Sequence, residues 1–204
     1  MSDVGLRERN KQETRRRITD AAIGLFAERG FEQVPVTEIA AAAEVSPATV
    51  FNYFPAKEDL IVHRGQEKTA ELIAALRETT PGGSVVTPFR RATEELLDAV
   101  ENEPVEEIVA IPRLVMNSHT LRERLFVGWE QEAAALAPAI AEVLELEPDD
   151  LLAAVMARSL SWTHRTIFRA AFSRLLAGED QVAVAASLRV EADRLYTKLQ
   201  RGFA

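Results

Sequence analysis

The chain has no cysteine among its 204 residues, and only 6% of its residues are aromatic. Without cysteine it forms neither a disulfide framework nor a thiolate metal site. It also lacks long apolar runs, because its uncharged stretches are far shorter than a membrane span. The charged first residues are not followed by the apolar segment of a secretory signal. We therefore expect a cytoplasmic protein that does not enter a membrane.

Motifs of catalysis are missing as well. The sequence has no glycine-rich phosphate loop, nucleophile elbow, metal motif or paired histidine–carboxylate set. His63, His119 and His164 are scattered without the spacing of metal ligands. We expect no enzymatic activity, no catalytic residue, no cofactor and no metal, and an all-helical enzyme is the least favoured alternative.

The net charge of −8 argues at first against a nucleic-acid partner. The charges are unevenly distributed, however, because residues 1–17 hold six basic and three acidic side chains. Acidic residues concentrate elsewhere, at 101–107 and 142–150. An acidic body with a basic start can bind DNA if the basic part faces the phosphates. The alternative interpretation of the basic start is a solvated, frayed terminus.

Strand-like alternation is almost absent, whereas alanine, leucine, glutamate and arginine recur at helical spacing. The pattern predicts an all-α chain. Start and stop signals predict about nine helices, at residues 12–29, 37–43, 47–54, 57–78, 87–102, 105–118, 120–146, 149–177 and 180–200. We place a boundary near residue 56, between a three-helix head (1–56) and a larger helical body (57–204). The fourth helix is expected to join them.

Residues 37–57 spell two short helices separated by a tight turn and followed by an aromatic cluster and a lysine. Thr37 is the expected N-cap of the first helix. Ser46 is the expected N-cap of the second, with Pro47 at the first helical position, where its missing N–H costs nothing. Upstream, Gly30 is expected to end the first long helix and to let the next residue fold back on Phe26.

The second short helix is predicted to turn Val50 and Phe54 inward, which leaves Thr49, Asn52 and Tyr53 on its outer side. Asparagine can bridge the edge of adenine, and threonine can hydrogen-bond a base or touch a thymine methyl group. A tyrosine hydroxyl suits a phosphate. The pair of helices therefore has the chemistry of a helix-turn-helix that places one helix in the major groove. The alternative is an ordinary pair of packed helices.

The run from Arg15 to Leu60 resembles the DNA-binding domain of the TetR family of bacterial transcriptional repressors. The resemblance rests on the order and spacing of Leu25-Phe26, Gly30-Phe31, Thr37, Ile39-Ala40, Val45-Ser46 and Phe54-x-x-Lys57. It implies binding to a double-stranded DNA operator. The implied DNA-binding residues are Arg15, Arg16, Thr37, Ser46, Tyr53 and Lys57 near phosphates or helix starts, and Pro47, Ala48, Thr49 and Asn52 at base edges.

Two positions depart from the family pattern. Glu44 occupies a turn position that is usually glycine, and a positive φ there would cost glutamate roughly 1 kcal/mol. Asn52 stands at a position that is often tyrosine, which changes the expected operator sequence but not the expectation of DNA binding.

The resemblance further implies a homodimer with a ligand cavity, released from a palindromic operator by a small molecule. In the last predicted helix, a narrow apolar seam is a candidate dimer interface; it comprises Ala185, Leu188, Ala192, Leu195 and Leu199. The same seam could instead pack within one chain. A ligand-independent DNA binder or activator is the alternative function.

The expected effector is apolar or amphipathic and anionic. Pro112 and Pro138 fall inside helical patterns and tend to kink them, which leaves space between helices. The candidate ligand-binding residues are Arg113, Met116, Leu121, Leu125, Phe126, Trp129, Trp162, Arg165 and Arg169. The apolar members could equally be plain core, and the arginine stripe that includes Arg158 could be a solvated face or an intersubunit ion-pair rim. The body also resembles TetR members that sense acyl-CoA-like ligands.

Overall fold

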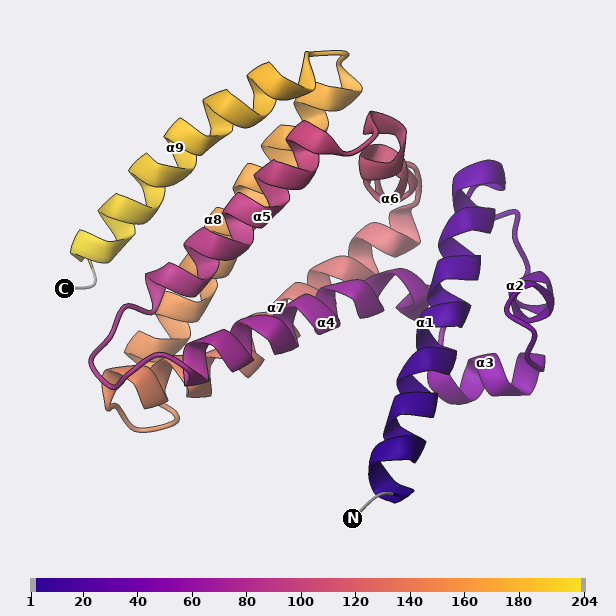
Figure 1. Cartoon of the computed structure of the whole chain (residues 1–204), viewed down its shortest axis with the longest axis horizontal. Helices are drawn as coiled ribbons and strands as arrows, with labels where there is room; N and C mark the ends of the chain where they lie inside the picture. The colour runs from indigo at the N-terminus through magenta and orange to yellow at the C-terminus, as the bar shows by residue number, and fades with distance from the viewer. Residues whose placement is uncertain (1–2, 203–204) are drawn as a thin grey trace. The chain divides into compact units, whose positions relative to one another are not determined.

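A computed structural model describes the backbone of residues 3–202, and the side chains of residues 9–63 and 65–202. This part of the chain contains nine helices and no strand, which confirms the all-α prediction (Figure 1). The helices are α1 (Asp3–Arg29), α2 (Val36–Ala42), α3 (Pro47–Tyr53), α4 (Asp59–Arg77), α5 (Val86–Asn102), α6 (Val105–Asn117), α7 (His119–Leu144), α8 (Leu151–Leu176) and α9 (Gln181–Gly202). Within the described range, no helix is both long enough and apolar enough to cross a membrane.

The helix ends agree with the sequence to within two residues, apart from the start of α1. This helix begins at Asp3, nine residues before the predicted start at Gln12. The prediction relied on apolar periodicity, which begins only near Ile18. Residues before Gln12 are rich in arginine, glutamate and lysine, which favour a helix without supplying a buried face.

The chain forms two compact units. The first unit holds residues up to Gly65 together with Arg113–Leu125, and the second unit holds Gln66–Pro112 and the residues from Phe126 onward. This division differs from the predicted boundary near residue 56. Within the first unit, the Ser118 hydroxyl donates to the Glu32 carboxylate at 3.0 Å and Arg124 donates twice to Asp59. These long-range contacts could not be read from local sequence patterns.

Most of the core of the first unit comes from α1, α2 and α3. Its buried apolar side chains include Ile18, Ala22 and Phe26 of α1, Ile39 and Ala40 of α2, and Val50 of α3. Gly30 ends α1 with a φ of 84°, and the Phe26 and Phe31 rings lie 5.0 Å apart. The predicted fold-back after Gly30 is therefore confirmed, and it closes the core between α1 and α2.

The turn between α2 and α3 passes through a left-handed residue. Glu44 has a φ of 55°, the Val45 N–H donates to the Ala40 carbonyl at 2.9 Å, and the Glu44 N–H donates to Ala41 at 3.1 Å. This pair of hydrogen bonds is a common motif at helix C-termini, in which the left-handed residue is usually glycine. The positive φ considered for this position from the sequence is therefore present, and a glutamate occupies a conformation that disfavours it.

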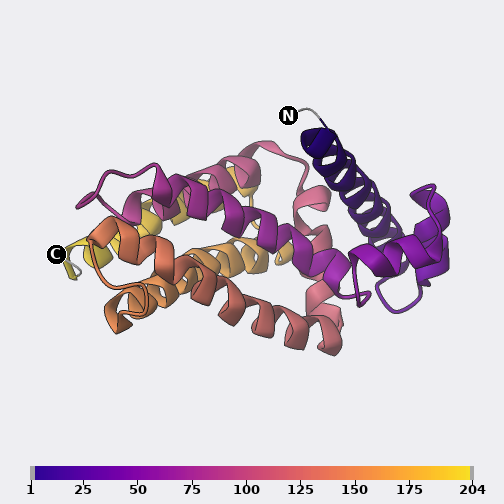
Figure 2. The same ribbon diagram turned by 90° about the horizontal axis from the view of Figure 1, so that it is seen from below.

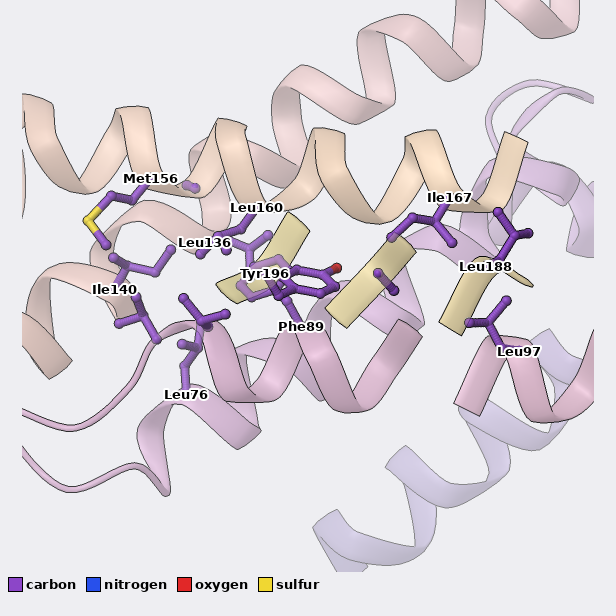
Figure 3. Packing of buried hydrophobic residues seen from close by; sticks show 14 of the residues in the cluster. Leu76, Phe89, Leu97, Leu136, Ile140, Met156, Leu160, Ile167, Leu188 and Tyr196 are labelled. Atoms are coloured by element: carbon purple, nitrogen blue, oxygen red, sulfur yellow. The ribbon is translucent and has the colours of Figure 1, made fainter. Parts of the chain in front are cut away.

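The second unit is organised around α5, α8 and α9. These helices lie side by side in Figure 1, and Figure 2 shows the same group after a turn of 90°. Their shared core contains Phe89 and Leu97 of α5, Leu160 of α8, and Leu188 and Tyr196 of α9 (Figure 3).

A hydrogen-bonded chain of three side chains crosses this core. The Thr93 hydroxyl lies 2.7 Å from the Tyr196 hydroxyl and 2.8 Å from His164 Nδ1. Burial lowers the pKa of His164 to about 4, with the nearby positive charges of Arg165 and Lys68 acting in the same direction. Burial also raises the pKa of Tyr196 to about 12. Both groups are therefore neutral at physiological pH, which suits a core with few compensating charges.

The apolar seam of α9 packs inside its own chain. Ala185, Leu188 and Ala192 are at most 6% exposed, and Leu195 and Leu199 pack partly buried against the same core. The predicted assignment of this seam to the dimer interface is therefore corrected. The spacing of such a seam shows that a helix packs against a partner, but not whether the partner belongs to the same chain. Here the partners are α5 and α8 of the same chain.

Charged contacts reinforce this packing. Arg189 of α9 donates to Glu94, Asp98 and Glu101 of α5 at 2.5–2.8 Å, and these hydrogen bonds raise the pKa of its guanidinium. One arginine thus joins three acidic residues that lie on one face of the neighbouring helix.

Replacing Glu44 with glycine should raise the free energy of unfolding by about 0.5–1 kcal/mol, because glycine adopts a positive φ without steric cost. Glu44→Ala is the matched control, since alanine has the same difficulty at this φ and should leave stability nearly unchanged. Urea unfolding measures both. Equal stability of the glycine and alanine variants would contradict the proposed strain.

Candidate nucleic-acid interface

The start of α3 is fixed by a side-chain cap. The Thr49 N–H donates to the Ser46 hydroxyl oxygen at 3.0 Å, and Pro47 occupies the first turn. Both features confirm the sequence prediction. The Thr49 hydroxyl lies 2.8 Å from the same Ser46 oxygen, so it already has a hydrogen-bond partner. A helix of seven residues needs such local support, because short helices are marginal alone.

One side of α3 is buried and the other is open. Val50 and Phe54 are 1% and 2% exposed, as predicted for the inner face. The outer side carries four exposed residues and two partly buried ones; the exposed residues are Pro47, Ala48, Phe51 and Asn52, and the partly buried ones are Thr49 and Tyr53. Asn52 is thus accessible from outside the protein.

Phe51 is the residue that the sequence interpretation missed, because it was assigned to neither face. Its side chain is 51% exposed. Helical geometry contained the signal: Phe51 follows the inward Val50 by one residue and is turned about 100° away from it around the helix.

Arg15 supports α3 from behind. Its guanidinium donates to the Tyr53 carbonyl at 3.4 Å and lies 5.9 and 5.6 Å from the rings of Tyr53 and Phe54. The side chain is partly buried, so its visible role is to hold the end of α3. Arg16 differs, because its side chain is 77% exposed beside Asp20 at 3.6 Å.

Lys57 also makes contacts within the first unit. Its ammonium donates to the Phe31 carbonyl and lies 4.5 Å from the Phe31 ring and 5.5 Å from the Phe26 ring. Partial burial lowers the pKa of Lys57. An ammonium has three donors, and the contact with the carbonyl uses one of them.

Thr37 is not an N-cap. α2 begins at Val36, with Pro35 as its N-cap residue and no side-chain cap. The Pro35 carbonyl accepts hydrogen bonds from Glu38 and Ile39, and Thr37 lies exposed within the first turn. The prediction was wrong because proline fits the extended N-cap backbone two positions earlier than the sequence pattern suggested. The Thr37 hydroxyl is left at the helix start without a capping role.

Residues 18–63, which include α2 and α3, match the family model of the bacterial regulatory proteins, tetR family. Over this segment the chain is similar to the TetR family. The matched segment contains the Ser46 cap, the buried face of α3 and its open outer side, so the family match and the geometry concern the same residues.

Named relatives of the chain are regulators of transcription. The HTH-type transcriptional regulator TcmR of Streptomyces glaucescens is 28% identical over 151 residues, which cover 72% of this chain and 67% of TcmR. The HTH-type transcriptional repressor KstR of Mycolicibacterium smegmatis is 32% identical over 92 residues, which cover 45% of this chain and 44% of KstR. The solved structure of Salmonella enterica GusR is 27% identical, with a TM-score of 0.51, and the match covers 91% of this chain and 96% of GusR.

These findings agree with the prediction that the chain is a DNA-binding transcriptional regulator and not an enzyme. Among the described residues, no three histidine, aspartate or glutamate side chains lie together in a way that could hold a metal ion. The chemistry on the surface of α3 is that of hydrogen bonding and apolar contact, which are the means of reading base edges.

The candidate ligand residues are divided between the two units. Arg113, Met116, Leu121 and Leu125 belong to the first unit, where Leu121 is fully buried core. In the second unit, the Trp129 ring lies 6.5 Å from Phe126 and 5.8 Å from Trp162, and the Arg165 guanidinium lies 5.2 Å from it. We call these four residues the aromatic cluster. Phe126 and Trp162 are 54% and 41% exposed.

Two of the three arginines in the stripe beside this cluster form ion pairs with glutamates of α7. Arg165 of α8 pairs with Glu132 of α7, and Arg158 pairs with Glu130 at 3.2 Å. Burial lowers the pKa of Arg165 and raises that of Glu132, while their mutual attraction opposes both shifts. Arg169 lies exposed on α8. Both ion pairs join α7 and α8 of the same chain, whereas the ion-pair alternative from the sequence placed such pairs between subunits.

Ser46→Ala should lower the free energy of unfolding by about 1 kcal/mol, because the Thr49 N–H loses its acceptor. Ser46→Asp should keep this stability, since aspartate is an equally good cap, but weaken DNA binding by placing a negative charge close to the phosphates. Thermal unfolding and a DNA titration distinguish the two effects. Unchanged stability in Ser46→Ala, or undiminished DNA affinity in Ser46→Asp, would contradict this account.

Proposed function

We propose that the chain is a homodimeric transcriptional repressor that binds a roughly palindromic operator and is released from it by a small molecule. The observation that carries this proposal is the outer side of α3, where Ala48 and Asn52 stand exposed on a helix held by the Ser46 cap. In the proposed complex, α3 enters the major groove and Asn52 bonds a base edge. Pro47, Ala48 and Thr49 line the same contact.

The phosphate contacts are part of the same proposal. Thr37 and Arg16 are exposed, Tyr53 is partly exposed, and Lys57 retains N–H donors beyond its bond to Phe31. These groups would fix the position of α3 along the duplex without reading sequence. Arg15 would contribute indirectly by holding the end of α3.

Dimer formation is supported by apolar side chains that the chain leaves exposed on α8 and α9. Val182 and Val190 of α9 are 51% and 70% exposed, and Leu151 and Val155 of α8 are 81% and 55% exposed. We take these exposed apolar side chains, which lie along two adjacent helices, as the candidate surface for burial against a second copy. A two-fold dimer would place two α3 helices in successive major grooves, about 34 Å apart, which explains the expected palindrome.

The effector is proposed to be an apolar or amphipathic anion. The aromatic cluster offers ring faces to an apolar group, and the exposed Arg169 on the neighbouring part of α8 offers a charge-assisted contact to a carboxylate or phosphate. An acyl-CoA-like molecule has both features. To act, the effector must bind one conformation of the dimer more tightly than another, since equal affinity shifts no equilibrium. The helix α4 supplies residues to both units and is the proposed lever.

The proposal is tested by selecting bound sequences from random duplex DNA and comparing the wild type with Asn52→Ala. The wild type should select a palindrome. The variant should lose discrimination at one base position in each half-site by roughly 1–3 kcal/mol while retaining nonspecific binding. Titration of single-base variants of the operator measures this loss. An equal weakening on operator and random DNA would exclude base reading by Asn52, and a non-palindromic selection would contradict the dimer.

Val190→Glu should make the protein monomeric, because a charge at the proposed interface would be buried without a partner. The monomer should remain folded, since Val190 is 70% exposed within one chain. Leu195→Glu is the contrasting variant and should destabilise the protomer itself. Sedimentation equilibrium and thermal unfolding measure the two properties. A Val190→Glu dimer as tight as the wild type would remove this surface from the interface.

A further inference from the structure

Phe51 is exposed in a unit that buries its other phenylalanines. Its side chain is 51% exposed, whereas Phe26, Phe31 and Phe54 are at most 5% exposed. The core of the first unit is closed without Phe51, so packing does not account for a large aromatic residue at this position. Exposure of such a ring on the helix proposed to contact DNA suggests that the ring serves binding.

Phe51 does not stand alone on the surface of α3. Pro47 and Ala48 precede it by four and three residues, and both are exposed. Residues with these spacings lie next to one another on a helix. Pro47, Ala48 and Phe51 therefore form an apolar strip beside Asn52. The small side chain of Ala48 leaves room for a base edge to approach the helix closely.

The chemistry of α3 restricts which bases it can read. The helix contains no arginine or lysine, the side chains that bond the two acceptors of guanine. The Thr49 hydroxyl is already bonded to Ser46. What remains is the Asn52 amide, which suits adenine, and the apolar strip, which suits the methyl group of thymine.

We propose that Phe51, together with Ala48, holds the 5-methyl group of a thymine in the major groove and thereby sets the base preference at that operator position. This inference rests on the proposed function and names a residue that determines its specificity. It also predicts that the part of each half-site read by α3 consists of A·T pairs. Thymine differs from uracil only in this methyl group, which makes the contact testable atom by atom.

The experiment uses the full-length chain and the operator obtained by selection. Thymines are replaced by deoxyuridine one symmetric pair at a time, which removes the methyl group without changing base pairing. Affinity is measured for the wild type, Phe51→Ala, Phe51→Leu and Asn52→Ala. At one position, loss of the methyl group should weaken wild-type binding by about fourfold for each half-site, as expected for burial of one methyl group.

The variants separate this contact from its neighbours. The DNA affinity of Asn52→Ala should still fall when the methyl group is removed. The affinity of Phe51→Leu should fall by less, and that of Phe51→Ala should not change. Thermal unfolding checks that the exposed position tolerates each change. The inference is overturned if no thymine responds in the wild type, or if Phe51→Ala responds as strongly as the wild type. Absence of selective DNA binding by the wild type would instead overturn the proposed function, and this inference with it.

Discussion

Burial of Val50 and Phe54 decides which side of α3 faces outward. Both side chains are at most 2% exposed, and they anchor a helix of only seven residues. Such a helix has little stability of its own, so its orientation depends on this packing and on the Ser46 cap. The exposed positions of Ala48, Phe51 and Asn52 follow from that orientation. The proposed reading of bases thus depends on two apolar contacts.

Cations of the first unit hold this arrangement in place. Arg15 contacts the carbonyl of Tyr53 and two aromatic rings. Lys57 contacts the carbonyl of Phe31 and two other aromatic rings. Positive charge near the proposed DNA surface therefore also stabilises the head. This dual use is compatible with a chain whose net charge is −8, because the specific contacts require shape and hydrogen bonding more than a strongly basic surface.

Much of this architecture could be predicted from sequence, because local signals determine it. Helical periodicity predicted the nine helices that the described residues form, and Gly30, Ser46 and Pro47 marked ends and starts that the structure confirms. Information about distant partners was missing. The α9 seam has the same spacing whether it packs on α5 or on a second chain, and no local signal tied Asp59 to Arg124. Similarly, the charge of Arg15 suggested a phosphate contact, whereas its aromatic neighbours in the fold give it a supporting role.

The central claim is that the outer side of α3 touches the bases. An NMR titration of the isotope-labelled protein with the DNA sequence obtained by selection addresses it most directly. Signals of the Asn52 side-chain amide and of the backbone amides of Ala48 and Phe51 can be followed individually. The account predicts that these signals shift strongly with operator DNA and less with a random duplex of the same length. If all three signals stayed unchanged while the operator was bound, the proposed DNA-binding surface would be contradicted.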